Sequence, residues 1–305
     1  MSETAGLYIH IPFCLKKCLY CDFYSLEGQT LGIIDTYISA LLKEAGFYRE
    51  RLRRVNTIYI GGGTPSILEI NQLRALLEGL SGYLKKEQII EFTIEANPKS
   101  ITREKLLLMK EYGVTRISLG VQSFREEDLL ILGRTHTVQE AFRAIEAIKS
   151  CSFELSVDLI YGIPGQTFRD WADNLLRLID FPRLSQEPPI EHISTYELTV
   201  EEGTPLSKEI KSGHLRKPPD EELAKIYEYT VGFLEERGYI HYEVSNFAMP
   251  ARECLHNLNY WKRGEYIGLG AGAHSFLDGE RRENLELQEY IAVSYTHLRA
   301  HETGR

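Results

Sequence analysis

Three cysteines near the start of the chain have the spacing of a metal-binding loop. Cys14, Cys18 and Cys21 form a C-x3-C-x2-C pattern, and the whole sequence holds 5 cysteines. An odd number, with three packed between positions 14 and 21, is a poor disulfide framework because such close neighbours cannot all pair with distant partners. Metal or redox chemistry in a reducing compartment is therefore expected.

Two kinds of metal centre fit three cysteines on one short loop. A four-iron four-sulfur (4Fe-4S) cluster held by three thiolates keeps one iron open for another ligand. A structural zinc ion normally takes four protein ligands, and here His10, Cys151 or Cys254 would have to supply the fourth. The loop favours the cluster, with a structural zinc-binding protein as the alternative.

Composition excludes several classes of protein. The 305 residues are 43% hydrophobic and 26% charged, which is typical of globular proteins and excludes disorder, coiled coil and collagen. Lys plus Arg number 35 against 44 Asp plus Glu, a net charge of −9 that argues against nucleic acid as a partner. No apolar run is long enough to span a membrane and no signal peptide is recognisable, so we expect a cytoplasmic protein.

Short β-branched runs alternate with longer stretches of helical periodicity, which is typical of a parallel α/β protein. Both an open sheet and a full or partial barrel remain compatible with this alternation. The expected strands are Leu7–Ile11, Thr57–Ile60, Glu91–Glu95, Arg116–Gly120, Leu155–Ile160 and His192–Glu197. The expected helices are Ile33–Arg53, Leu68–Leu84, Arg103–Tyr112, Val138–Lys149 and Phe168–Ile179.

Polar residues recur directly after these strands. They fall at Gly61–Ser66, Glu95–Pro98, Gln122 and Asp158–Pro164. Barrel and open-sheet enzymes both bind their ligands at the carboxyl ends of parallel strands. The sequence therefore predicts one site at that edge, next to the cysteine loop.

The pattern changes after Thr199. Residues 201–219 are rich in Gly, Pro and charge, and a helix near Glu221–Arg237 and a strand near Tyr239–Ser245 follow. We divide the chain into a core at 1–199 and an α+β extension at 200–293. The last residues, 294–305, continue neither pattern and are expected to be a non-native or disordered tail.

The cysteine spacing resembles that of the radical S-adenosylmethionine (SAM) superfamily. Further ordered blocks resemble the oxygen-independent coproporphyrinogen III oxidase group within it, and together they run from Tyr8 to about Ser275. The resemblance implies an α/β fold, a partial (β/α)6 TIM-like barrel with a C-terminal α+β extension. The blocks are Tyr8–Phe13, Gly61–Pro65, Glu95–Pro98, Val121–Phe124 and Asp158–Pro164.

The same resemblance implies the cofactors and the residues that contact them. Cys14, Cys18 and Cys21 would hold the 4Fe-4S cluster, whose open iron binds SAM; one-electron reduction then gives a 5′-deoxyadenosyl radical. Carboxylates can accept hydrogen bonds from ribose or an ammonium group, and an arginine can clamp a carboxylate. The SAM-contacting positions would be Tyr8, Tyr20, Gly62, Gly63, Thr64, Glu95, Gln122, Arg134 and Asp158.

Two features favour the heme chaperone (HemW) branch of this group over the oxidases. The oxidases resemble this chain but carry a further cysteine two residues after the third one, whereas here Asp22 and Phe23 follow Cys21. The chaperone branch carries an H-N-x-x-Y-W motif, and His256–Trp261 matches it completely. An oxygen-independent coproporphyrinogen III oxidase is the alternative.

The chaperone resemblance implies heme as a third cofactor. His256 would be its axial ligand, because imidazole ligates iron and neighbouring aromatic rings can pack on the macrocycle. The partner would be an apo-hemoprotein at the membrane surface by analogy with that branch, and a homodimer is left open. We expect SAM binding without the oxidase's decarboxylation.

Overall fold

The computed structural model describes residues 5–184 and 189–293, so the expected tail at 294–305 lies outside the described residues. One 11-stranded sheet has the order β13-β12-β11-β1-β4-β5-β6-β7-β8-β10-β9. Seven consecutive strands, from β11 to β8, run parallel to one another. They are β11 (Tyr266–Leu269), β1 (Ala5–Ile11), β4 (Val55–Gly62), β5 (Glu91–Ala96), β6 (Arg116–Gln122), β7 (Glu154–Tyr161) and β8 (His192–Glu197).

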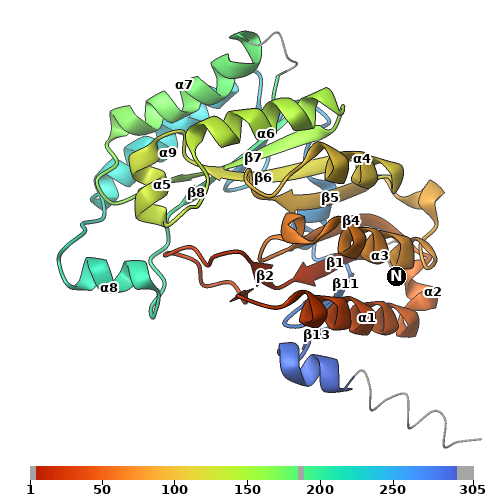
Figure 1. Cartoon of the computed structure of the whole chain (residues 1–305). Coiled ribbons are helices and arrows are strands. Elements are labelled where there is room, and N and C mark those ends of the chain that lie inside the picture. The colour runs from red at the N-terminus through yellow and green to blue at the C-terminus, as the bar shows by residue number, and fades with distance from the viewer. Residues whose placement is uncertain (1–4, 185–188, 294–305) are drawn as a thin grey trace, which may run out of the picture.

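The expected strands and crossover helices are confirmed, but the helices expected at 33–53 and 68–84 are shorter, and the second spans only 70–81. The first ends at Phe47, and a separate turn, α2 (Arg49–Leu52), follows it. The helices cover one face of the curved sheet (Figure 1), as in a partial barrel. They are α1 (Leu31–Phe47), α3 (Ile70–Ser81), α4 (Arg103–Glu111), α6 (Val138–Ser150) and α7 (Phe168–Leu184).

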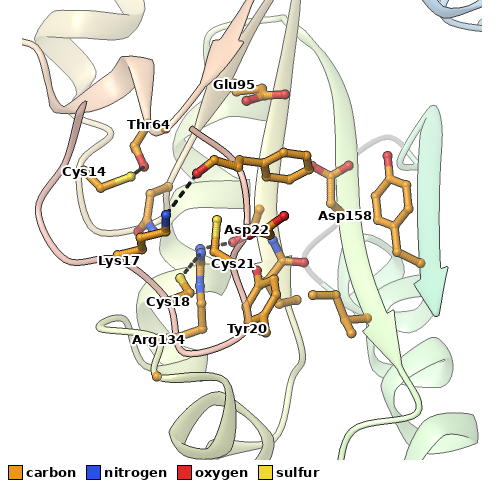
Figure 2. A pocket seen from close by; sticks show the side chains of 18 of the residues that line it. Cys14, Lys17, Cys18, Tyr20, Cys21, Asp22, Thr64, Glu95, Arg134 and Asp158 are labelled. Atoms are coloured by element: carbon orange, nitrogen blue, oxygen red, sulfur yellow. Dashed lines mark hydrogen bonds between the residues drawn. The ribbon is translucent and has the colours of Figure 1, made fainter. Parts of the chain in front are cut away.

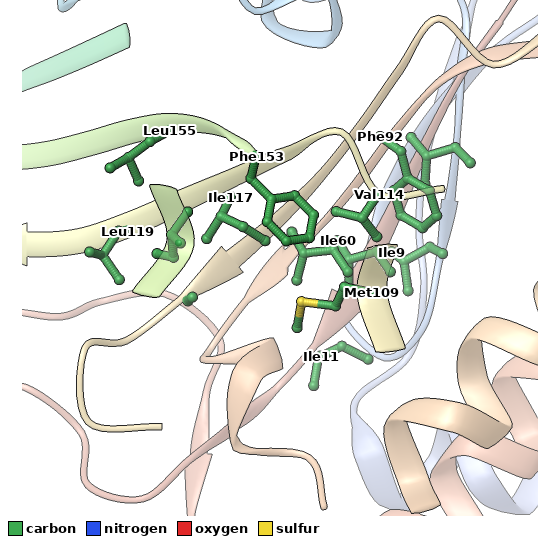
Figure 3. Packing of buried hydrophobic residues seen from close by; sticks show 14 of the residues in the cluster. Ile9, Ile11, Ile60, Phe92, Met109, Val114, Ile117, Leu119, Phe153 and Leu155 are labelled. Atoms are coloured by element: carbon green, nitrogen blue, oxygen red, sulfur yellow. The ribbon is translucent and has the colours of Figure 1, made fainter. Parts of the chain in front are cut away.

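The hydrophobic core lies between the sheet and these helices. Side chains at alternate strand positions, such as Ile60, Ile117 and Leu155, are fully or almost fully buried. Figure 3 shows them packed together with Met109 from α4. Because side chains alternate across a strand, every second residue must point to the other side of the sheet.

The opposite face of the strands is polar, and it forms the barrel interior. Thr93 and Glu95 on β5, Ser118 on β6, and Ser156 and Asp158 on β7 occupy these alternate positions. Buried polar groups need hydrogen-bond partners, and Ser118 Oγ donates to Asp158 Oδ2 at 3.0 Å. The outer face of the barrel sheet thus packs hydrophobic side chains against the helices, and its inner face carries polar side chains.

A buried charge cluster closes the amino end of the barrel. The Arg116 guanidinium lies 3.4 Å from Glu91 and 3.1 Å from Glu154. Glu91 in turn accepts from the backbone N–H groups of Leu255 and His256 at the start of α10 (Leu255–Trp261). An acidic side chain at a helix N-terminus satisfies its free N–H groups, so Glu91 fixes α10 beneath the barrel.

The segment after residue 199 extends the barrel sheet at both edges. β10 (Asn246–Ala248) and β9 (Ile240–His241) add to β8, and β12 (His274–Leu277) and β13 (Glu280–Glu283) add to β11. The expected strand at 239–245 is wrong in extent, because the chain turns between β9 and β10, which then pair antiparallel. The division at residue 199 stays a prediction.

Two helices of this segment pack against the core barrel. α9 (Asp220–Glu235) confirms the expected helix, and α8 (Pro205–Lys211) starts where Thr204 caps it. The Leu206 N–H of α8 donates to the Leu19 carbonyl of the cysteine loop at 2.9 Å. The region at 200–219 therefore braces the loop. Among the described residues, no helix has the length and apolarity needed to cross a membrane.

Candidate functional site

The cysteine loop leaves β1 and is tied down at several points. Two short parallel strands, β2 (Phe13–Cys14) and β3 (Leu26–Glu27), pair at its base. The Lys17 N–H donates to Glu27 at 2.8 Å, and the Lys17 ammonium donates to the Phe23 carbonyl at 3.1 Å. The Leu19 N–H donates to the carbonyl of Leu132 at the end of α5 (Glu126–Leu132). These bonds fix the loop over the barrel mouth.

A cavity of about 550 Å³ lies between this loop and the carboxyl ends of the strands. The cavity lies at the edge where the sequence predicts the site. Figure 2 shows the loop on one side of the cavity and the strand residues Glu95 and Asp158 on the other. Of the predicted residues, those that line it are Cys14, Cys18, Tyr20, Cys21, Gly62, Gly63, Thr64, Glu95, Gln122, Arg134 and Asp158.

The three thiols have separate neighbours. Cys14 Sγ lies 3.5 Å from Thr64 Oγ1, and Arg134 donates to Cys18 Sγ at 3.4 Å. Among the described residues, no three His, Cys, Asp or Glu side chains form a group that could hold a metal ion. In a 4Fe-4S cluster each cysteine binds a different iron, so that chemistry does not require them to meet at one point.

The residues that could complete a zinc site are engaged elsewhere. His10 has one ring nitrogen 2.9 Å from the Tyr8 hydroxyl and the other 2.8 Å from the Tyr24 carbonyl. Cys254 is buried at the amino end of the barrel, with Sγ 3.4 Å from Glu91. Cys151 ends helix α6. The structure thus gives the zinc alternative no fourth ligand from this set.

Arg134 reaches the site through a helix end that sequence patterning did not show. Helix α5 ends at Gly133 with φ 71°, a left-handed conformation that favours glycine and turns the chain back toward the loop. The guanidinium then donates to the Gly120 carbonyl of β6 at 2.6 Å as well as to Cys18. Arg134 therefore joins the cysteine loop to the sheet.

Two polar atoms of the cavity wall lack partners among the described residues. They are Gln122 Oε1 and Arg134 Nε, and both are buried. Gln122 also has φ 69°, a left-handed backbone conformation that is strained for residues other than glycine. It lies at a register shift between β6 and β7. Buried groups left without partners at a strained position are typical of a ligand-binding wall.

The glycines after β4 bring backbone close to the cysteine loop. A Cβ on Gly63 would lie 2.7 Å from the Phe13 carbonyl oxygen and 3.0 Å from Cys14 Sγ. Gly62 has φ 114°, and its N–H donates to Glu95 at 3.1 Å. A Cβ on Gly63 would collide with the cysteine loop, and one on Gly62 would meet the His10 ring, so the two glycines allow this backbone and the loop to pack closely.

The two cavity carboxylates have raised pKa values. Burial raises the pKa of Glu95 to about 7, with the charge of Asp158 adding to the effect and hydrogen bonds from Tyr59 and Gly62 opposing it. Burial likewise raises the pKa of Asp158 to about 6, although hydrogen bonds from Ser194, Ser118 and Ser156 oppose it. Perturbed carboxyl groups in a cleft are typical of functional sites.

Sequence reasoning missed three residues that line the cavity from inside the strands. They are Tyr59 on β4, Ser118 on β6 and Tyr196 on β8. The Tyr59 hydroxyl donates to Glu95 at 2.9 Å and so orients that carboxylate. Each lies at a strand position whose side chain points into the barrel. The alternation of polar and apolar residues along the strands could have identified them from the sequence.

Tyr8 and His256 do not line the cavity. Tyr8 lies below it, stacked on Tyr59 with ring centroids 6.4 Å apart. The His256 ring also stacks on the Tyr59 ring, with the two centroids 5.5 Å apart. His256 is fully buried, with Nδ1 3.0 Å from Thr57 Oγ1 and Nε2 2.8 Å from the Tyr260 hydroxyl. Burial lowers its pKa to about 3.

Comparison with known proteins agrees with this geometry. Residues 8–178 match the model of the radical SAM superfamily. The chain is 39% identical over 306 residues to the heme chaperone HemW of Lactococcus lactis, covering 99% of this chain and 78% of that protein. It belongs to the HemW family of radical SAM proteins. Another HemW relative, from Bacillus subtilis, is 38% identical over 93% of this chain and 74% of its own length.

A solved structure shares the fold of this HemW family member. The coproporphyrinogen III oxidase HemN of Escherichia coli, described as a radical SAM enzyme, superposes with a TM-score of 0.81. It covers 96% of this chain and 69% of its own, at 24% identity. The match confirms the partial barrel of the radical SAM type that the sequence predicted.

The raised pKa values predict a pH-dependent stability. Protonated Glu95 and Asp158 stabilise the folded state below about pH 4, and this contribution is lost as the pH rises through about 6 and 7. The double substitution Glu95→Gln and Asp158→Asn should therefore gain stability over the wild type between pH 4 and 8, by an amount of the order of 1–3 kcal/mol.

Chemical denaturation of the cluster-free protein across this pH range measures the effect. Glu87→Gln, at an exposed carboxyl, is the control and should run parallel to the wild type. If the stability of the double variant also followed that of the wild type across this pH range, the raised pKa values would be contradicted.

Proposed function

We propose that this protein is a radical SAM-type heme chaperone. It would bind a 4Fe-4S cluster and SAM in the carboxyl-edge cavity, bind heme, and deliver the heme to an apo-hemoprotein. The observation that carries the proposal is the cavity itself, in which the three loop cysteines face the polar ends of the barrel strands. The names of its relatives support the heme-delivery part.

The residues of the cavity fit both absent groups. Cys14, Cys18 and Cys21 would hold the cluster, which when bound supplies one-electron chemistry and an open iron for SAM. The unpartnered Gln122 Oε1 and Arg134 Nε can bind polar groups of SAM, and Gly62 and Gly63 let the backbone approach the cysteine loop closely. The remaining proposed contacts are Tyr20, Gly62, Gly63, Thr64, Glu95 and Asp158, with Tyr8 supporting them from below.

The chain's own residues control charge and water in this cavity. Tyr59 holds Glu95 in place, and Ser118 holds Asp158, so two carboxylates face the bound ligand in fixed positions. Since the pKa values of both lie near neutrality, each can be neutral or charged according to its ligand. Leu19 and Tyr20 pack into a small apolar cluster that covers one side of the cavity and limits access of water.

Heme ligation by His256 meets an obstacle in this structure. Both ring nitrogens are engaged, with Thr57 and Tyr260, and the ring is buried beneath the barrel. Coordination of iron through either nitrogen would require one of these hydrogen bonds to break and the buried ring to become accessible. His256 thus stays a proposed axial ligand only for a rearranged state. The acceptor would be a hemoprotein at the membrane surface, reached from the cytoplasm.

The cluster proposal predicts about four irons per chain after anaerobic reconstitution. Cys14→Ala, Cys18→Ala and Cys21→Ala should each lose the cluster, because each removes a ligand of one iron. Cys151→Ala is the matched control and should keep it, since Cys151 lies at the end of α6. Iron and zinc analysis with an absorption spectrum is the measurement. Zinc without iron would overturn the proposal.

The chaperone proposal predicts no decarboxylation of coproporphyrinogen III. The oxidase alternative shares the fold, so activity distinguishes them. An anaerobic assay with SAM, a reductant and coproporphyrinogen III should leave the substrate unchanged, with the E. coli oxidase as the positive control. Formation of protoporphyrinogen IX by this chain would instead assign it to the oxidases.

A further inference from the structure

One row of side chains crosses the sheet at its amino end and continues beyond the helix that covers it. Thr57 and Gly6 lie at neighbouring positions of β4 and β1, and Gly6 is the partner of Tyr266 on β11. Tyr266 pairs with Phe276 on β12, and Phe276 pairs with Arg281 on β13. His256 of α10 covers Thr57 and Gly6, and the rest of the row lies beyond it.

This uncovered part of the row lines a second cavity of about 500 Å³. Its walls are the aromatic rings of Tyr260, Tyr266 and Phe276, together with Arg263, Gly264 and Arg281. The rings of Tyr260 and Tyr266 meet edge to face, with centroids 4.7 Å apart. A volume of this size is in the usual range for a small-molecule ligand, and the ring-lined walls suit a flat aromatic one.

The two arginines give the cavity a positive charge. Among the described residues, neither Arg263 nor Arg281 has an ion-pair partner, whereas their neighbour Arg282 contacts Glu280 at 3.0 Å. Glu283, on the same face as Arg281, lies 3.8 Å from His274. A guanidinium binds a carboxylate bidentately, so this pair suits a ligand with two carboxylates.

The position of Arg263 costs conformational energy. It has φ 54°, the left-handed conformation that favours glycine, directly after the end of α10. Gly264 follows it and packs so closely that a Cβ would meet the Asn259 side chain. The N–H groups of Arg263 and Gly264 donate to the carbonyls of Tyr260 and Asn259, so this turn ends α10 and places Arg263 on the cavity wall.

We infer that this cavity binds a porphyrin dicarboxylate through ring stacking and the two arginines, without iron ligation by His256. The inference rests on the proposed heme chaperone function and names the site of its cargo. Arg263 and Arg281 would hold the two propionates, and Tyr260, Tyr266 and Phe276 would pack on the macrocycle. Because the cavity is open at the surface, bound heme could pass to an acceptor without a buried metal bond having to break.

Titration of the whole chain with three porphyrins, followed by absorption and fluorescence, tests this site. Hemin and iron-free protoporphyrin IX should bind with affinities within a few-fold of each other, because stacking and charge need no iron. The dimethyl ester of protoporphyrin IX should bind about tenfold more weakly or worse, because it lacks the carboxylates.

Substitutions test which residues bind the porphyrin. Arg263→Ala with Arg281→Ala should weaken hemin and protoporphyrin IX by about tenfold or more. Arg282→Ala, on the opposite face of the same strand, should leave both affinities unchanged, and His256→Gln should leave the ratio of the hemin affinity to the protoporphyrin IX affinity unchanged. Binding of hemin but not protoporphyrin IX, lost in His256→Gln and kept in the arginine variant, would overturn this site and leave the chaperone function standing. No binding of either porphyrin by the wild type would contradict both.

Discussion

The structure depends on a barrel interior that is polar and must satisfy its own hydrogen bonds. Each strand places hydrocarbon toward the helices and a hydroxyl, carboxyl or guanidinium toward the inside. Leaving one partner of a buried ion pair alone costs about 3–5 kcal/mol, so the buried charges are paired, although Thr93 Oγ1 and Arg116 Nε and Nη1 have no hydrogen-bond partner among the described residues. Arg116 with Glu91 closes the amino end, and Ser118 with Asp158 orders the carboxyl end.

This division gives the two ends of the barrel different tasks. At the amino end Glu91 holds helix α10, so the buried His256 belongs to the packing of the barrel floor. At the carboxyl end two polar atoms stay without partners, and the cysteine loop is held over them by Arg134. Tyr59 connects the ends, because its hydroxyl contacts Glu95 and its ring stacks near His256.

Much of this arrangement could be predicted from the sequence. The positions of most strands and helices follow from local patterns, such as Thr137 with Glu140 at the start of α6, and the carboxyl-edge site follows from parallel strands. The position of the Arg134 side chain in the cavity could not be predicted, because it depends on the left-handed turn at Gly133. The H-N-x-x-Y-W motif could not show that its histidine is buried, because that depends on the distant residues Thr57 and Glu91.

The central claim is that the carboxyl-edge cavity places SAM against a cluster held by the loop cysteines. Electron paramagnetic resonance of the anaerobically reconstituted, reduced protein tests it most directly, recorded with and without SAM. A ligand bound at the open iron should alter the spectrum of the reduced cluster. SAM should change the spectrum of the wild type, and this change should be lost in the double variant Arg134→Ala with Gln122→Ala. A spectrum that SAM leaves unchanged in the wild type would contradict it.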